Sequence, residues 1–494
     1  MKLSELLEEV RCSKEELYIA ADTDVEVTGL AYDSREEMKE GTLFACFKGH
    51  NFDGHDHAAE AVEKGARVLL VDRPLDIPKE RAAQLLVPDV RYFFAFLAAA
   101  FYGNPAEKMK VIGLTGTKGK TTSTFMLQEL LNESGHTCGL IGTVQVDTHG
   151  RVIPADHTTP EALQLQEYFR EMVDNGCDSV VMEVSSLALK MHRTQGFLFD
   201  IGVFTNLTPD HIGGNEHEDF EEYKECKKML FRQSRVAIGN TDDPYCYEML
   251  EDCPGMHYLF AIDQDADLRA TDLKPFFEGG KLGMDCNLSG IMKGSLRIAL
   301  PGRFSVYNAM TAILPALLMG VGEDVIRDVM GRITVRGRIE MVPVSKDYTL
   351  MVDYAHNAVA LESLLVTLRA HEPHRLVTLF GCGGNRDKKR RFEMGEVSGR
   401  LSDLTVITSD NPRFEEPEAI LDDIETGIKP TGGAYVRIAD RKEAIRYAIL
   451  NAEPGDIIVL AGKGHEPYQE IKGVKYHMDE RELVRQVVEE EHIS

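Results

Sequence analysis

The sequence predicts an α/β protein of about three domains, with a mainly parallel sheet in its central part. Three observations predict this class. The 494 residues, 43% of them hydrophobic, exceed what one domain of roughly 150 residues requires. From about residue 108 onward, short β-branched runs alternate with polar or glycine-rich loops and helical segments. One of these loops, at 113–122, separates a strand-like run from a helical pattern.

The predicted elements fall into three stretches, for which we expect domains at 1–107, 108–335 and 336–494. The first contains strand-like runs at 41–47 and 66–71, an apolar helix at 92–102 and the turn 103–105. The second has strand-like runs at 111–114, 138–141, 179–184 and 201–205. The third has them at 349–352, 376–380, 404–408 and 457–460. Ligands of open α/β sheets bind in the loops that follow such strands.

The charge balance is acidic, with 81 Asp and Glu against 55 Lys and Arg and a formal net charge of −26. Such a chain repels nucleic-acid phosphates and anionic membrane surfaces, so we expect no nucleic-acid partner. An anionic small molecule would need a locally positive pocket or bound metal cations.

Nine cysteines, with no C-x-x-C pair, predict reduced and mostly buried thiols in a cytoplasmic protein. The acidic start of the chain does not resemble a signal peptide. The most apolar run, 92–102, is about half the length that crosses a bilayer. We therefore expect no membrane insertion.

The glycine-rich segment 113–122 is the strongest local signal of function. A phosphate site needs glycines that turn backbone N–H groups inward, a lysine for the outer phosphates and a hydroxyl for Mg²⁺. Lys120 and Thr121 supply the lysine and the hydroxyl. Leu114 stands where a P-loop has its first glycine, so the match is imperfect. A nucleoside triphosphate site is favoured over a simple glycine-rich turn into a helix.

Further motifs follow this loop in order and carry a family resemblance. They are Glu183-Val184-Ser185-Ser186, Thr205-Asn206-Leu207 with Asp210-His211, Asp353-Tyr354-Ala355-His356, Asp410-Asn411-Pro412-Arg413 and the 462–466 segment Gly-Lys-Gly-His-Glu. With the glycine-rich loop, this series resembles the Mur ligase family, and within it the tripeptide synthetases of peptidoglycan synthesis.

The resemblance implies a UDP-substrate-binding domain, a central P-loop-type ATPase and a C-terminal Rossmann-like domain that binds an amino acid. The implied activity is that of an ATP-dependent amide ligase. It would add meso-diaminopimelate to UDP-N-acetylmuramoyl-L-alanyl-D-glutamate through an acyl phosphate. Crowded anions in such a reaction suit Mg²⁺ ions and basic side chains.

The resemblance also implies roles for individual residues of the central domain. Nucleotide contacts fall on Thr115, Gly116, Thr117, Lys118, Gly119, Lys120, Thr121 and Thr122. Metal ligands fall on Thr121, Glu183, His211 and Lys227, of which Lys227 and His211 join Lys120 as catalytic residues. Mg²⁺ is a hard cation that prefers oxygen ligands. The assignment of the His211 nitrogen as a metal ligand therefore rests on the resemblance alone.

Lys227 lies in a segment that resembles the one carrying the family's carbamylated lysine. A carbamate offers two anionic oxygens to a metal, and its formation from CO₂ needs a neutral amine. Lys224, Lys227 and Lys228 compete for this role, and the spacing from Tyr223 favours Lys227. A solvated helix surface is the alternative for each lysine.

Other roles rest more heavily on the resemblance. Asn308, Arg338 and Asp353 match positions near the nucleotide, although Asn308 as a helix cap and Arg338 in a surface ion pair are alternatives. The UDP-linked substrate is matched by Ser34, His50, Asn51, Phe52, Thr158, Thr159, Ser185 and Arg193. Hydroxyls and an arginine suit pyrophosphate and carboxylate oxygens. Thr159-Pro160 as a simple helix start is the alternative there.

The amino-acid site is expected on Arg386, Asp410, Asn411, Pro412, Arg413, Gly462 and Glu466. Arg413 is the informative residue. Diaminopimelate has a carboxylate beside its far amine that lysine lacks, and an arginine can clamp a carboxylate with two hydrogen bonds.

Some positions depart from the family pattern and keep alternatives open. Lys118 replaces a usual asparagine, and His157, Leu187 and Met191 differ on the substrate side. The alternatives are the same chemistry with L-lysine or another amino acid, a paralogous ligase for another carboxylate substrate, and a regulatory protein that keeps a nucleotide site without turnover.

Overall fold

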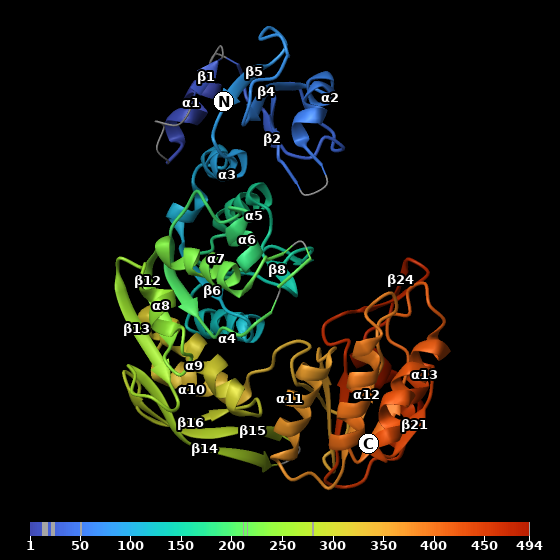
Figure 1. Cartoon of the computed structure of the whole chain (residues 1–494). Helices are drawn as coiled ribbons and strands as arrows, with labels where there is room; N and C mark the ends of the chain where they lie inside the picture. The colour runs from blue at the N-terminus through green and yellow to red at the C-terminus, as the bar shows by residue number, and fades with distance from the viewer. Residues whose placement is uncertain are drawn as a thin grey trace. The chain divides into compact units, whose positions relative to one another are not determined.

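The computed structural model describes residues 1–11, 18–20, 25–49, 52–210, 212–214, 216–278 and 281–493. Contacts between residues divide the chain into two compact units, which are described separately (Figure 1). The first comprises Met1–Arg269 and Met310–Val325, and the second Ala270–Ala309 and Ile326–Ser494. Among the described residues, no helix has both the length and the apolar character needed to cross a bilayer.

The first unit begins with a five-stranded sheet in the order β1-β5-β4-β3-β2, parallel except for the pairing of β1 with β5. Its strands are β1 (Tyr18–Ala20), β2 (Gly29–Ala31), β3 (Thr42–Ala45), β4 (Ala66–Val71) and β5 (Ala83–Leu86). The helices around it are α1 (Leu3–Glu9), η1 (Gly54–His57), α2 (Ala58–Glu63), α3 (Val90–Phe101) and η2 (Pro105–Lys108).

Alternating side chains give this sheet two apolar faces. Leu43 of β3 packs in one cluster with the buried faces of α1 and α3, whereas the adjacent Phe44 packs in another with α2. Asp89 caps α3 by accepting a hydrogen bond from the backbone N–H of Tyr92 at 2.9 Å, which fixes where the apolar helix begins.

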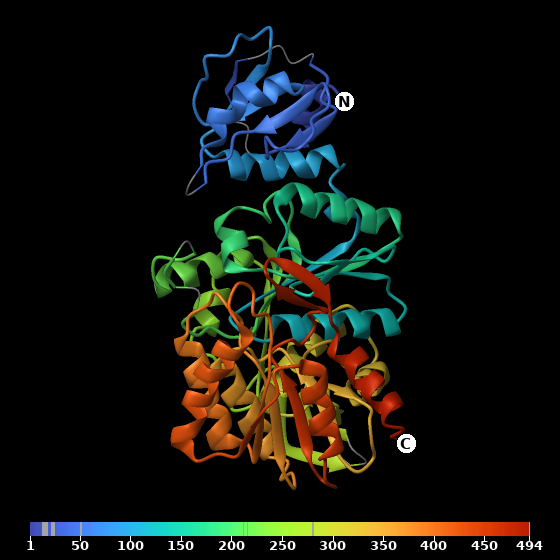
Figure 2. The same cartoon turned by 90° about the vertical axis from the view of Figure 1, so that its right-hand side faces the viewer.

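A larger sheet follows, in the order β13-β12-β11-β6-β10-β7-β8-β9, parallel from β13 through β7. Its strands are β6 (Lys110–Thr115), β7 (Cys138–Ile141), β8 (Gln145–Asp147), β9 (Val152–Pro154), β10 (Ser179–Glu183), β11 (Phe199–Phe204), β12 (Ser234–Asn240) and β13 (Met256–Ala261). The accompanying helices are α4 (Lys120–Glu133), α5 (Ala162–Asp174), α6 (Ser186–Lys190), α7 (Phe220–Arg232) and α8 (Cys246–Leu250). Figure 2 shows α4 and α5 on opposite faces of β6.

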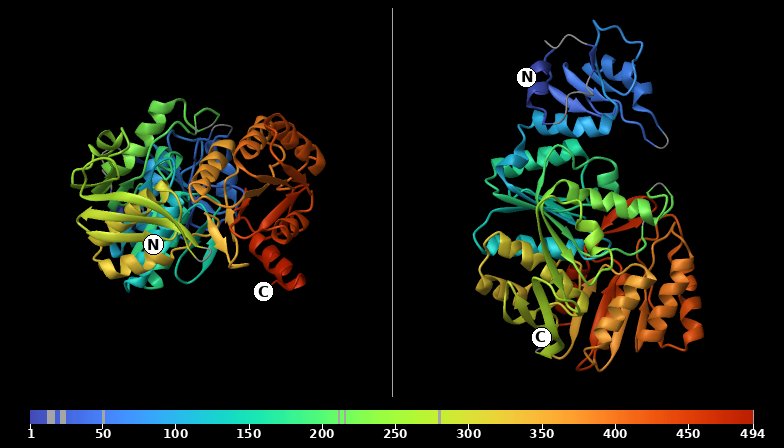
Figure 3. Two further views of the ribbon diagram at one scale, coloured as in Figure 1. Left: turned by 90° about the horizontal axis from the view of Figure 1, so that it is seen from below. Right: turned by 60° about the vertical axis from the view of Figure 1, so that its left-hand side comes forward.

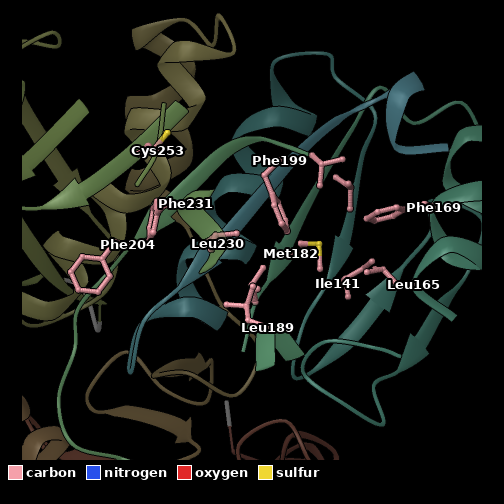
Figure 4. Packing of buried hydrophobic residues seen from close by; sticks show 14 of the residues in the cluster. Ile141, Leu165, Phe169, Met182, Leu189, Phe199, Phe204, Leu230, Phe231 and Cys253 are labelled. Carbon is pink, nitrogen blue, oxygen red and sulfur yellow. The ribbon is translucent and has the colours of Figure 1, made fainter. Parts of the chain in front are cut away.

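One apolar cluster joins this sheet to α5, α6, α7 and α8. In Figure 4, Phe169 of α5 points toward Met182 of β10 and Ile141 of β7. Phe231 of α7 lies on the other side of the cluster, where Phe204 of β11 also lies. All five of these side chains are buried. The packing holds the carboxyl ends of β6, β10 and β11 side by side, which is where the functional loops begin.

The second unit is built on a six-stranded sheet in the order β17-β18-β22-β19-β20-β21, parallel except at β17. The strands are β17 (Glu340–Val342), β18 (Thr349–Asp353), β19 (Leu376–Phe380), β20 (Leu404–Ile407), β21 (Tyr435–Arg437) and β22 (Ile457–Ala461). The helices are α11 (Ala358–Arg369), α12 (Lys389–Leu401), α13 (Pro417–Ile428), η3 (Lys429–Thr431), α14 (Arg441–Leu450) and α15 (Glu480–Glu490). The hairpin of β23 (Tyr468–Ile471) and β24 (Val474–His477) follows β22.

The segment before this sheet carries three successive strands, β14 (Leu268–Glu278), β15 (Lys281–Gly290) and β16 (Gly294–Ile298), of which β15 and β16 pair antiparallel (Figure 3, left, yellow-green). Leu268 and Arg269, at the start of β14, pair with β13 inside the first unit. Helices α9 (Arg303–Leu318) and α10 (Glu323–Arg332) each contribute residues to both units.

The predicted fold class is confirmed, and most predicted strands coincide with observed ones to within two residues. The expected strand at 41–47 is shorter than predicted, since only Thr42–Ala45 forms β3. The backbone N–H of Phe47 turns back to Ala45 O, and Phe47 O accepts from the N–H of Gly54, so the chain leaves the sheet there. All eight cysteines in the described part of the chain are free and buried, as predicted.

A buried ion pair ties two strand ends of the second unit to α14 and α15. Arg441 donates to Glu480 Oε1 from Nε at 2.9 Å and from Nη2 at 2.7 Å, and each side chain is only 1% exposed. The same guanidinium donates to Ser409 O at 3.0 Å and to Ala461 O at 3.2 Å. Burial raises the pKa of Glu480.

We expect Glu480→Gln to destabilise the protein by about 3 to 5 kcal/mol, because it leaves the Arg441 charge buried without its partner. Urea denaturation measures this change. Lys442→Met is the matched control, since the exposed Lys442–Glu490 pair also joins α14 to α15 and its loss should cost under about 1 kcal/mol. Equal effects of the two substitutions would contradict the role of the buried pair.

Candidate active site

The glycine-rich loop between β6 and α4 is held from the outside by the segment that follows β11. The backbone N–H groups of Thr117 and Lys118 donate to Asn206 O at 2.8 Å and to Asn206 Oδ1 at 2.9 Å. Thr205 Oγ1 and Asn206 Nδ2 both donate to Lys118 O. A Cβ on Gly116, whose φ is +145°, would lie 2.0 Å from Thr205 Oγ1, so only glycine fits.

The rest of the predicted phosphate loop continues into the elements on either side. Thr115 ends β6, and its hydroxyl donates to Val184 O at 2.9 Å. Gly119, at φ +90°, occupies the N-cap position of α4, and Thr122 is buried in the first turn of that helix. The loop is therefore a strand-to-helix turn with its helix N-terminus directed as an anion site requires.

Two lysines predicted to be catalytic meet at one backbone oxygen of the loop. Lys120 Nζ donates to Gly116 O at 2.7 Å and to Thr117 O at 3.2 Å. Lys227 Nζ, from α7, donates to Gly116 O at 3.0 Å. The Lys120 ammonium makes this end of the loop positive, which suits a polyanionic ligand, and the buried Lys227 amine lies on the same carbonyl.

Burial, and then the neighbouring Lys120 ammonium, lower the pKa of Lys227 well below that of an ordinary lysine. Its Nζ lies 4.6 Å from the centre of the Tyr223 ring. The flanking lysines of α7 differ, because each is held by two carboxylates: Lys224 by Glu221 and Glu248, and Lys228 by Glu251 and Asp252. For Lys227 the structure shows no ion pair with any described residue. The geometry thus separates the three lysines that the sequence left in competition.

The carboxylate of Glu183 lies at the end of β10, buried among hydroxyl groups. Its Oε2 accepts from Thr121 Oγ1 and Thr143 Oγ1, each at 3.1 Å, and its Oε1 accepts from the Thr143 N–H at 2.8 Å. Thr143 Oγ1 also lies 3.1 Å from Thr158 Oγ1. A set of carboxylate and hydroxyl oxygens fits a hard divalent cation. Thr143 was not predicted, because it lies in no motif.

The residues expected to contact the peptide part of the substrate come together beside Glu183. Thr159 Oγ1 donates to Glu183 O at 2.9 Å and accepts from the Ser185 N–H at 3.1 Å. Arg193 donates to Thr159 O at 3.0 Å and pairs with Glu161 at 2.6 Å. α5 begins only at Ala162, so Thr159 acts as a tie to β10 rather than as a simple helix start.

Two of the residues expected to hold the uridine end, Ser34 and Phe52, belong to the described part of the chain. Ser34 O accepts from Lys64 Nζ at 2.5 Å, whereas the Ser34 hydroxyl bonds none of the described residues. Phe52 is exposed. His50 and Asn51, as well as the expected metal ligand His211, lie outside the described residues.

In the second unit, Asp353 ends β18, and the charge of Arg338 is near enough to act on its carboxylate. Asp353 accepts from the backbone N–H groups of Ile339 and Ala355, both at 2.8 Å, and burial raises its pKa. The Arg338 guanidinium lies 5.0 Å from the centre of the Tyr354 ring. Asn308 lies within α9, so the alternative that it caps a helix is wrong.

The predicted amino-acid residues converge where β19, β20 and β22 end. Asn411 O accepts from the Gly384 N–H at 2.9 Å, and Arg413 Nη1 donates to Gly384 O at 2.9 Å. A Cβ on Gly383 would lie 3.6 Å from Arg413 Nη1 and 3.8 Å from Arg386 Cγ, which places the two arginines around one glycine. Pro412 belongs to the same turn, since a Cβ on Gly384 would lie 1.9 Å from its carbonyl oxygen.

The loop after β22 closes this group of residues. A Cβ on Gly462 would lie 3.0 Å from Asp410 Oδ2, and Glu466 Oε2 accepts from Asn411 Nδ2 at 3.0 Å. Outside the predicted set, Glu470 of β23 accepts from Arg413 Nε at 3.1 Å. Lys463 also lies in this group, and although it belongs to a quoted motif, nothing in the sequence assigned it a role.

Comparison with known proteins gives matches along nearly the whole chain. Residues 26–102 match the Mur ligase family catalytic domain, 114–316 the Mur ligase middle domain and 337–464 the Mur ligase glutamate ligase domain. A relative from Caldanaerobacter subterraneus subsp. tengcongensis, a UDP-N-acetylmuramoyl-L-alanyl-D-glutamate–2,6-diaminopimelate ligase, is 41% identical over 491 residues, or 99% of either chain.

Solved structures agree with these matches. The structure of a ligase with that same name aligns over the full length of both chains, with a TM-score of 0.74 and 28% identity. The MurF ligase of Thermotoga maritima, solved in complex with ADP, shares the fold with a TM-score of 0.58 and 19% identity over 95% of this chain and 99% of that one. The chain is therefore a member of the Mur ligase family.

Proposed function

We propose that this protein is the ATP-dependent ligase that adds meso-diaminopimelate to UDP-N-acetylmuramoyl-L-alanyl-D-glutamate in peptidoglycan synthesis. The terminal carboxylate of the peptide would accept the γ-phosphate and become an acyl phosphate. The amine of the incoming amino acid would then attack it, forming the amide and releasing phosphate. The relative from Caldanaerobacter bears the name of this activity at 41% identity.

The observation that carries the proposal is the mixed charge of the loops after β19, β20 and β22. Arg386 and Arg413 flank Gly383, while Asp410 and Glu466 contribute carboxylates to the same group of loops. Diaminopimelate has a second head that carries both a carboxylate and an ammonium group. Protein arginines can bind the carboxylate of this head, and protein carboxylates can bind its ammonium group. Lysine as a substrate would offer only the ammonium group.

The first unit supports the nucleotide part of the proposal. Lys120 and those loop amides that Asn206 does not engage would bind the phosphates of ATP, and the oxygens of Thr121 and Glu183 would hold Mg²⁺. The bound cation would neutralise phosphate charge. We further propose that Lys227 is carbamylated and becomes a metal ligand, together with His211.

The remaining assignments complete the proposal. Asn308, Arg338 and Asp353 would contact the nucleotide. The UDP-linked substrate would be bound by residues of the first unit, namely Ser34, His50, Asn51, Phe52, Thr158, Thr159, Ser185 and Arg193. These roles go with the domain boundaries at 107/108 and 335/336, and the free buried cysteines fit a cytoplasmic setting.

We expect Gly116→Ala to weaken ATP binding on the order of tenfold or more, because the new Cβ would push Thr205 and Asn206 away from the loop. Titration calorimetry with a non-hydrolysable ATP analogue measures the effect. Gly135→Ala is the control, since Gly135 also has a positive φ, +95°, but a Cβ there would meet nothing within 4 Å. Equal affinity of the Gly116 variant and wild type would contradict this account of the loop.

Lys227→Ala should lower activity at least roughly 100-fold, and short carboxylates such as formate should restore part of it by replacing the carbamate oxygens. Wild-type protein in ¹³C-bicarbonate should show a carbamate signal by NMR that the variant lacks. Lys228→Ala, which removes an ion-paired lysine of the same helix, should keep both signal and activity. Normal turnover by Lys227→Ala would show that the assignment is wrong.

The decisive test of the amino acid is a competition assay with diaminopimelate, lysine and ornithine. Wild type should prefer diaminopimelate, and Arg413→Ala should reduce that preference by a factor of tens to thousands, because a charged hydrogen bond of about 2 to 5 kcal/mol is lost. Arg400→Ala, which removes an exposed arginine paired with Glu362, should change nothing. Preference for lysine, or indifference to the loss of Arg413, would refute diaminopimelate as the substrate.

A further inference from the structure

Lys463 is a fully buried lysine at the centre of the loops after β20 and β22. Its side chain is 0% exposed. Its Nζ donates to Asn411 Oδ1 at 2.9 Å and to Glu466 Oε2 at 3.0 Å, and it lies 3.6 Å from Asp410 Oδ1. These three partners are residues already assigned to the amino-acid site, and Lys463 contacts every one of them.

Burying an ammonium group is costly unless several acceptors surround it, so the position of Lys463 depends on both loops at once. Asp410 and Asn411 follow β20, whereas Glu466 belongs to the loop after β22. The Tyr468 ring, whose centre is 5.1 Å from Nζ, adds a contact from β23. Lys463 thus joins two loops that no strand pairing connects directly, since β19 lies between β20 and β22 in the sheet.

The contacts also fix the orientation of the Asn411 amide. Asn411 Oδ1 accepts from Lys463 and from the backbone N–H of Glu470, the latter at 2.9 Å. With its oxygen engaged by two donors, the amide must present Nδ2 to Glu466 Oε2, which accepts it at 3.0 Å. Glu466 Oε2 therefore has two donors, and within the described residues Oε1 has none.

Opposite charges surround each other in this group of loops. Asp410 and Glu466 place their carboxylates beside the Lys463 ammonium, while Arg386 and Arg413 lie around Gly383 in the same loops. Without Lys463, the two acids would repel each other in a buried setting before any ligand arrived. With it, both carboxylates are held beside one ammonium group, and Glu466 Oε1 remains as an acceptor for the ammonium group of an amino acid.

We propose that Lys463 is a positioning residue for amino-acid binding, which orients Asn411 and Glu466 before the ligand arrives. The inference rests on the proposed function in that it takes the amino acid to be the ligand of these loops. Lys463 itself does not contact the ligand in this proposal. It acts through Asn411 and Glu466.

The test compares Lys463→Met with Lys475→Met. Lys475 is exposed and its Nζ lies 4.4 Å from the centre of the same Tyr468 ring, so the control removes a lysine beside that ring without touching the carboxylates. Lys463→Met should raise the KM for diaminopimelate roughly ten- to a hundred-fold. The KM values for ATP and for the UDP-linked substrate should stay unchanged, and kcat should fall less than the amino-acid KM rises. Lys475→Met should resemble wild type.

A second measurement needs no substrate and separates this inference from the proposed function. Hydrogen exchange of peptides covering 409–413 and 462–468 should speed up in Lys463→Met and not in Lys475→Met. Lys463→Gln, which keeps a neutral donor, should give intermediate exchange and an intermediate KM. If the wild-type protein does not use diaminopimelate, the proposed function is wrong. The hydrogen-exchange rates of the two peptides would still show whether Lys463 holds the loops in place.

Three results would overturn the proposal. The first is unchanged exchange in both peptides, and the second is an equal rise in the KM of all three substrates. The third is failure of both Lys463→Met and Lys463→Gln to fold, which would make Lys463 a general structural residue.

Discussion

Several charged side chains of this protein are buried where segments far apart in the chain supply their partners, and this requirement shapes both units. A buried ion needs several hydrogen bonds, and the carboxyl ends of neighbouring parallel strands are the places where such partners gather. Glu183 is surrounded by hydroxyls from α4 and from the segment after β7. Lys227 reaches from α7 to the glycine-rich loop. Each buried charge therefore also ties together the loops that surround it.

The two units use this constraint for opposite kinds of ligand. Around Gly116 the first unit places the Lys120 ammonium and the buried Lys227 amine on one backbone oxygen, which prepares the loop for phosphate. At the ends of β20 and β22 the second unit sets Asp410 and Glu466 around Lys463, which leaves acceptors for an ammonium group. The overall charge of −26 thus coexists with a local positive site, as the sequence required for an anionic ligand.

Much of the fold followed from the sequence, because strand-length apolar runs and the glycine-rich loop are local signals. Glu183 was also predictable, since it is the last residue of a buried strand. Among the lysines of α7, the spacing from Tyr223 favoured Lys227, but the carboxylates that pair with Lys224 and Lys228 lie in the following helix and loop and were not visible in that spacing. Thr143 and Lys463 gain their importance from contacts with residues far along the chain, and no spacing within their own segments reveals those contacts.

Arg413 has a left-handed backbone, with φ +53°, and its side chain spans Gly384 O and Glu470 Oε2. It is therefore a structural tie of its own turn as well as a candidate contact for substrate. If a related enzyme came to use a different amino-acid substrate through replacement of Arg413 alone, that replacement would also loosen the turn. It would leave Glu470 without its partner. A shift in substrate is thus expected to pass through paired substitutions, with the hairpin of β23 and β24 evolving together with the loop that it supports.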